Sequence, residues 1–70
     1  MNNLKLSVII PCFNEEKTIA KIIEQVSANE DIVHEIIIVD DNSSDRSKKI
    51  ITDLSKINKK IKFHFKDKNE

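Results

Sequence analysis

The sequence predicts an α/β fold with the element order β-α-β-α-β. Three short segments are rich in β-branched or alternating apolar residues, and between them lie two segments whose apolar residues recur with helical spacing. A strand–helix–strand connection joins parallel strands through a right-handed crossover. The three strands are therefore expected to form one parallel sheet.

The first strand–helix unit begins with the β-branched run at residues 6–10. Pro11 is expected to end this strand, because proline has no N–H to give to a sheet ladder. Asn14 is a residue of the N-cap type, and the two acidic residues after it suit the positive end of a helix. The next apolar residues recur at i, i+3, i+4 and i+7 and predict a buried helical stripe of Ile19, Ile22, Ile23 and Val26.

The second unit repeats this arrangement. A β-branched run at residues 36–39 predicts a strand that ends at Asp40 and Asp41, and the polar segment 42–45 supplies a turn and helix caps. In residues 61–66 apolar and polar side chains alternate, which is typical of a strand with one exposed face. Before that strand comes a second helical stripe, formed by Ile50, Ile51, Leu54 and Ile57.

The patterns of the three strands predict their order. The first two are continuously apolar, as in strands covered on both faces, whereas the third alternates, as at a sheet edge. The expected order is 3-2-1, with both helices on one face. Two helices on one face leave the other face bare, so we expect elements outside these 70 residues to cover it. Residues 1–70 are interpreted as the N-terminal, incomplete part of a larger domain.

Composition excludes several kinds of site. The chain contains no glycine, which excludes a Walker loop and a GxGxxG dinucleotide turn. The single cysteine, Cys12, allows no internal disulfide and forms no zinc site with His34 and His64. We expect the thiol to serve packing and both histidines to face solvent.

The net charge is zero but uneven, at −6 over residues 1–45 and +6 over residues 46–70. The basic residues of the second part fall between regularly spaced apolar residues and lack an aromatic stacking set, so we expect no nucleic-acid partner. No apolar run approaches the ~20 residues that span a bilayer. We expect a cytoplasmic protein, with a membrane anchor beyond residue 70 left open.

Residues 11–15 and residues 39–42 form the carboxyl ends of the first two strands. They are expected to meet in one crevice, because ligands of open α/β sheets bind at the carboxyl ends of the strands. An ionised carboxylate only accepts hydrogen bonds, so its natural partner is a uracil imide, a guanine amidine or a ribose hydroxyl. Pro11 and Phe13 are suited to flank a flat base.

Residues 7–16, SVIIPCFNEE, and residues 35–45, EIIIVDDNSSD, resemble the opening of family 2 glycosyltransferases. The Asn-Glu-Glu variant in the first segment resembles the dolichol- and polyprenyl-phosphate sugar transferases in particular. The resemblance implies a GT-A fold, which is a Rossmann-like nucleotide-sugar domain. It also implies inverting transfer of a sugar from a UDP- or GDP-sugar to a polyprenyl-phosphate or glycan acceptor, in the cytoplasm or at the cytoplasmic face of the membrane.

Three nucleotide-binding residues that the resemblance implies follow the first strand. Pro11 and Phe13, which is commonly tyrosine in the family, would line the nucleobase pocket. Glu15 would sit beside the nucleotide.

Three more implied nucleotide-binding residues follow the second strand. Val39 would make a backbone or packing contact, and Asp41 would contact the base edge. Asp40 would bind the nucleotide, orient the loop or cap the second helix. Asn42 stands where the family usually has glycine, and asparagine tolerates a positive φ better than most residues.

The resemblance also implies a divalent metal, Mg²⁺ or Mn²⁺, whose ligands are not in this chain. The family's Asp-x-Asp motif, which holds that metal on the diphosphate, does not occur after Asp45, and the acid that serves as general base is missing too. The chain would therefore hold no catalytic and no metal-binding residue. We expect it to be inactive alone.

The same residues also allow other readings. Asp40 and Asp41 form a common acidic turn, Glu15 and Glu16 suit a helix dipole, and Asp45 is expected to cap the second helix. A response-regulator receiver also carries an acidic pair after a strand, but after its first strand, whereas a whole strand–helix unit precedes the pair here. A further alternative is a non-catalytic remnant or interaction piece.

Overall fold

The computed structural model describes residues 6–29 and 31–67. It confirms the predicted α/β class and the order of the elements. These are β1 (Leu6–Cys12), α1 (Ile19–Ser27), β2 (Val33–Asp40), α2 (Ser47–Ile57) and β3 (Ile61–Phe65).

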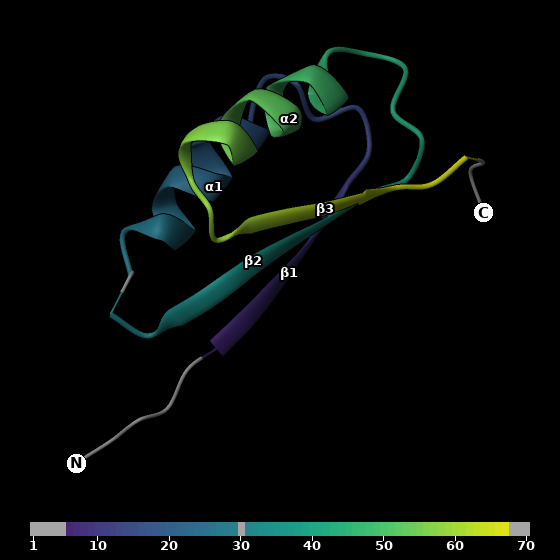
Figure 1. Ribbon diagram of the computed structural model, residues 1–70. Coiled ribbons are helices and arrows are strands. Elements are labelled where there is room, and N and C mark those ends of the chain that lie inside the picture. Colours follow the sequence, from purple (N-terminus) through teal and green to yellow (C-terminus); the bar gives the residue numbers. More distant parts are fainter. Residues whose placement is uncertain (1–5, 30, 68–70) are drawn as a thin grey trace.

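The three strands form one parallel sheet with β2 in the middle. The order β1-β2-β3 gives each strand the same neighbours as the predicted order 3-2-1, read from the opposite edge. Figure 1 shows α1 and α2 side by side on one face of this sheet. This placement follows because both right-handed crossovers step in the same direction across the sheet.

Pro11 does not end β1, so the strand is longer than predicted. Pro11 pairs in register with Val39, and β1 continues to Cys12. The carbonyl oxygen of Cys12 accepts a hydrogen bond from the N–H of Asp41 at 2.8 Å, which turns Cys12 toward β2. The preceding residue therefore faces the open edge of β1, where proline's missing N–H costs no ladder bond.

The first helix begins at Ile19, and its N-cap residue is Thr18. The prediction that Asn14 caps this helix is therefore wrong. Asn14 has a φ of 51°. The carbonyl of Glu15 accepts from the N–H groups of Thr18 and Ile19, and this turn leads into α1. The left-handed backbone of Asn14 instead places its side chain among the residues that follow β2.

The core lies between the helices and the sheet and consists mainly of isoleucine. Ile36 and Ile38 of β2 and Ile51 of α2 are fully buried and belong to one hydrophobic cluster. The helical stripes are buried only in part, since Ile22 is exposed although the sequence predicted it in the core. Helix α2 packs along one flank of α1, and in the described residues no element covers the other flank.

Within residues 6–29 and 31–67, no element covers the second face of the sheet, and Ile9 is 66% exposed there. A polar row crosses this face near the start of the strands. The Ser7 hydroxyl donates to Glu35 Oε2 at 2.7 Å, and Lys62 Nζ lies 3.6 Å from Glu35 Oε1. The hydrogen bond from Ser7, opposed by partial desolvation and aided by Lys62, lowers the pKa of Glu35. The bare face is therefore less apolar than the strand sequences indicate.

Two isoleucines on α2 test how much stability the core supplies. Ile51 is 0% exposed and Ile57 is 82% exposed. Ile51→Ala is expected to lower the free energy of unfolding by about 2–5 kcal/mol, because it removes buried methyl and methylene groups and leaves a cavity. Ile57→Ala is the matched control, with an expected change below about 0.5 kcal/mol. Urea titration followed by circular dichroism measures both, and equal losses would contradict this core.

Candidate functional site

A cavity of about 360 Å³ opens at the carboxyl ends of the strands. Four of the six residues expected to bind a nucleotide line it, and two further residues complete the lining. The set is Pro11, Cys12, Phe13, Val39, Asp41 and Lys66.

The cavity lining is apolar on the β1 side, where it includes Pro11, Cys12 and Phe13. Phe13 is 45% exposed, and Pro11 is exposed beside it. Val39 lies opposite Pro11 in the register of the two strands. An aromatic ring and a pyrrolidine ring at the rim offer a planar ligand a stacking surface of the kind that a nucleobase uses.

The loops after β1 and β2 are held together by side chains that cap the backbone of the opposite loop; we call these contacts the cross-loop network. In one direction, three successive N–H groups of the first loop donate to the second. The N–H of Asn14 donates to Ser43 Oγ at 2.8 Å, and that of Glu15 to Ser47 Oγ at 2.9 Å. The N–H of Glu16 donates to Asp45 Oδ2 at 3.1 Å.

The network also runs in the other direction. Asn14 Oδ1 accepts from the N–H groups of Ser44 and Asp45 at 2.8 and 3.3 Å. Glu16 Oε1 accepts from the N–H of Arg46 at 3.1 Å. Each loop therefore supplies both donors and acceptors to the other. The polar segment 42–45 was predicted to form a turn and caps, but its pairing with Asn14 was not predicted.

Asp40 does not line the cavity but holds the second loop through hydrogen bonds from Ser43. Its side chain is 0% exposed. Asp40 Oδ2 accepts from the N–H of Ser43 at 2.8 Å, and Oδ1 accepts from the Ser43 hydroxyl at 2.5 Å. Of the three roles left open for Asp40, these contacts fit loop orientation.

Asp45 lies one residue before Arg46, the N-cap residue of α2, and it contacts both the first turn of α2 and the first loop. Asp45 Oδ1 accepts from the N–H of Ser47, the first residue of α2, at 2.9 Å. Partial desolvation raises the pKa of the Asp45 carboxyl, but the hydrogen bonds from Ser47 and from the N–H of Glu16 outweigh it and lower the pKa below its ordinary value. The carboxylate form is therefore the one that the network stabilises.

The side chain of Glu15 does not line the cavity. It is exposed, and its Oε2 accepts from the Thr18 hydroxyl at 2.8 Å, ahead of α1. Its backbone belongs to the cross-loop network, so Glu15 lies beside the cavity through its main chain. The sequence assigned Glu16 only to the positive end of the helix dipole. Of Glu15 and Glu16, however, it is Glu16 whose carboxylate reaches the opposite loop.

Asp41 and Lys66 place opposite charges at the cavity. In the described part of the chain, Asp41 Oδ1 is a buried atom that accepts no hydrogen bond. Lys66 Nζ lies 3.9 Å from it, which is an ion pair beyond hydrogen-bond distance. Lys66 was not predicted as a site residue, because its position fits an ordinary polar position of an alternating strand. The signal that was available is its place directly after β3, level with Asp40 and Asp41.

Cys12 packs in the hydrophobic core, as predicted, and also lines the cavity. It is buried and unpaired. Burial, together with the neighbouring Asp40 carboxylate, raises the pKa of the Cys12 thiol, while the hydrogen bond from Ser47 opposes this. His34 and His64 are both exposed, also as predicted. In residues 6–29 and 31–67, no three His, Cys, Asp or Glu side chains gather to hold a metal ion.

Comparison with known sequences identifies the family of the chain. Residues 7–70 match the family described as Glycosyl transferase family 2. The chain belongs to glycosyltransferase family 2. Its parallel β-α-β-α-β unit is consistent with part of the Rossmann-like GT-A domain that the motifs implied.

Several curated relatives resemble this family 2 chain. A GalNAc(5)-diNAcBac-PP-undecaprenol β-1,3-glucosyltransferase from Campylobacter jejuni is 41% identical over 84% of this chain and 19% of the relative. An undecaprenyl-phosphate 4-deoxy-4-formamido-L-arabinose transferase from Yersinia enterocolitica is 41% identical over 69% of this chain and 16% of the relative. A transferase of the same name from an Enterobacter species is 35% identical over 73% of this chain. The chain thus spans less than a fifth of the length of these relatives.

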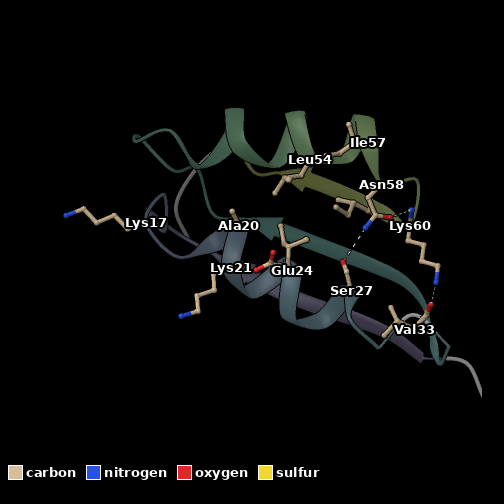
Figure 2. A pocket seen from close by; sticks show the side chains of 12 residues that line it. Lys17, Ala20, Lys21, Glu24, Ser27, Val33, Leu54, Ile57, Asn58 and Lys60 are labelled. Carbon is tan, nitrogen blue, oxygen red and sulfur yellow. Dashed lines mark hydrogen bonds between the residues drawn. The ribbon is translucent and has the colours of Figure 1, made fainter.

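A larger cavity of about 770 Å³ lies between α1 and α2 (Figure 2). Its apolar floor includes Ile23 and Leu54, and Asn58 Nδ2 donates across it to Ser27 Oγ at 3.2 Å. This groove is larger than the cavity beside Asp41, but it lies away from the carboxyl ends of the strands, where α/β sheets bind ligands. We therefore assign the candidate site of this family 2 chain to the smaller cavity.

The helices in the described residues are too short or too polar to cross a membrane.

The pKa of Asp45 makes the cross-loop network sensitive to acid. Because the pKa is lowered from 3.8 in the folded chain, the contribution of the carboxylate is full above that value and is lost as the pH falls through the folded pKa. The substitution Asp45→Asn removes this contribution of the carboxylate to stability. The unfolding free energies of wild type and Asp45→Asn are expected to differ by a constant amount between about pH 5 and about pH 8, and to converge below about pH 4.

Denaturant titrations at a series of pH values measure this difference. Asp53→Asn is the control, because Asp53 is exposed on α2 and pairs with Lys49 on the helix surface. Its effect is expected to stay below about 0.5 kcal/mol throughout. A gap between wild type and Asp45→Asn that persists at the lowest pH would show that the carboxylate charge does not hold the loops.

Proposed function

We propose that this chain forms the nucleoside-recognition part of a family 2 glycosyltransferase. The enzyme would transfer a sugar from a UDP- or GDP-sugar to a polyprenyl-phosphate or glycan acceptor. The observation that carries the proposal is the gathering of Pro11, Phe13, Val39 and Asp41 around one cavity at the carboxyl ends of β1 and β2. Membership of the family supports the same conclusion.

The base would enter this cavity edge first. Its face would lie on Phe13 and Pro11, and Val39 would pack against its side. Asp41 Oδ1 would accept from an N–H of the base edge, which would give this buried oxygen the hydrogen bond that it lacks in the described residues. A ligand N–H is favoured there because a carboxylate can only accept.

Asp40 and Glu15 would contribute indirectly. The buried carboxylate of Asp40 would orient the loop through Ser43, which in turn receives the N–H of Asn14. Glu15 would sit beside the nucleotide and fix the position of its own loop through its N–H bond to Ser47. Both residues would then act by placing Phe13 and Asp41.

The diphosphate and the acceptor would be bound elsewhere in the full enzyme. The divalent metal, Mg²⁺ or Mn²⁺, that the family implies would stabilise the leaving diphosphate, and we propose that its ligands and the general base lie outside this chain. The polyprenyl-phosphate acceptor is suggested by relatives named for undecaprenyl carriers. Such an acceptor would bring the full-length protein to the cytoplasmic face of a membrane.

The chain would bind nucleotides but not transfer sugar on its own. Sugar turnover by the purified chain would contradict this part of the proposal. The alternative of a non-catalytic remnant agrees with it, because a remnant can keep the nucleoside cavity. The receiver alternative is disfavoured by the match to family 2 over residues 7–70.

Asp41→Asn tests the proposed base contact. The amide keeps the size of the side chain but removes the charge, so the affinity for uridine diphosphate or guanosine diphosphate, whichever binds, is expected to fall about tenfold or more. The control is Asp31→Asn, an exposed residue before β2 at the opposite end of the sheet. Titrations followed by ligand-observed NMR measure both variants. Failure of the wild-type chain to bind either nucleotide, or equal affinities of wild type and Asp41→Asn, would contradict the proposal.

A further inference from the structure

The geometry points to Lys66 as a second base-edge contact, which donates a hydrogen bond to a carbonyl oxygen of the same base that Asp41 holds by its N–H. This inference rests on the proposed function, since it takes a nucleotide as the ligand of the cavity. It assigns a binding role to a residue of the third strand–loop junction, whereas the other proposed contacts come from the first two.

Lys66 is placed at the cavity by its backbone. Its N–H donates to the carbonyl of Asp40 at 2.9 Å, which extends the pairing of β3 with β2 by one residue beyond Phe65. The side chain then starts level with Asp41 and lines the same cavity. Its position is therefore set by the sheet and not by a free loop.

The contact between Lys66 and Asp41 leaves room for a ligand. The two side chains are 37% and 34% exposed, and 3.9 Å separates Nζ from Oδ1. At that distance neither group is satisfied by the other, because N–H···O bonds fall at about 2.7–3.2 Å. Attraction of the opposite charges keeps them together, and both remain able to bond to a third group.

The chemistry of the pair matches the edge of a lactam base. A carboxylate only accepts hydrogen bonds and an ammonium group only donates them. Uracil and guanine each carry a ring N–H directly beside a C=O. A base of this kind can give its N–H to Asp41 and receive a hydrogen bond from Lys66 on the adjacent oxygen. A phosphate in the place of the base would satisfy Lys66 but would be repelled by Asp41.

The experiment compares uridine with uridine diphosphate on the wild-type chain and on Lys66→Met, by ligand-observed NMR titration. Loss of a hydrogen bond from a charged donor is expected to lower the affinity for both ligands by the same factor, about tenfold. Lys66→Arg keeps a donor and is expected to recover most of the affinity. The matched control is Lys62→Met. Lys62 lies on β3, where its side chain pairs with Glu35 away from the cavity, so this change should leave affinity unchanged.

Sulfur analogues identify the bonded atom. In 2-thiouridine and 4-thiouridine a carbonyl oxygen becomes a weakly accepting sulfur, while the ring N–H remains. For one of the two analogues, Lys66→Met is expected to cause little further loss, because the bond is already weakened in the ligand. Circular dichroism confirms that each variant is folded.

The outcomes separate this inference from the proposed function. If Lys66→Met weakens only uridine diphosphate, Lys66 contacts phosphate and the inference is wrong. If neither ligand is affected, or if both sulfur analogues keep the full tenfold effect, it is also wrong, although nucleotide binding stands. If the wild-type chain binds neither uridine, guanosine nor their diphosphates, the proposed function fails and the inference falls with it.

Discussion

The candidate site depends on the cross-loop network between the connections that follow β1 and β2. Parallel strands bring their carboxyl ends to one edge of the sheet, but they do not by themselves fix the loops that continue from them. In this chain each loop caps backbone groups of the other, with Asn14 on one side and Ser43, Ser47 and Asp45 on the other. The wall at Phe13 and the carboxylate at Asp41 are held in position relative to each other as a result.

The network also explains why two acidic neighbours, Asp40 and Asp41, take different parts. Asp40 lies on the core side of the sheet and is fully buried, and both of its carboxylate oxygens accept hydrogen bonds from Ser43. Asp41 points to the cavity and keeps one oxygen without a hydrogen bond in the described residues. Successive side chains at the end of a strand face opposite ways, so Asp40 supports the loop while Asp41 faces the cavity. A chain without glycine manages these turns with asparagine, since the positive φ values fall on Asn14 and Asn42.

Much of the fold followed from periodicity, and the position of the cavity followed from the carboxyl ends of two neighbouring parallel strands. The resemblance added the roles of Val39 and Asp41. Helical and strand spacing gave all five elements, and the motif residues Pro11, Phe13, Val39 and Asp41 do share a cavity. The length of β1 was not predictable, because tolerance of Pro11 depends on which edge its nitrogen faces. The partners of Asn14 and the contact of Lys66 with Asp41 were not predictable either, since both join residues about 25 or more positions apart that only the sheet register brings together.

The most direct test is to locate the nucleotide on the folded chain. A titration of the ¹⁵N-labelled chain with uridine diphosphate or guanosine diphosphate, followed through its backbone amide signals, distinguishes the two cavities. The account predicts shifts at Phe13, Asp41 and Lys66 and at the loop amides of the cross-loop network, with the signals of α1 and the end of α2 unchanged. Shifts confined to the groove between the helices, around Ile23 and Leu54, would contradict the assignment of the site.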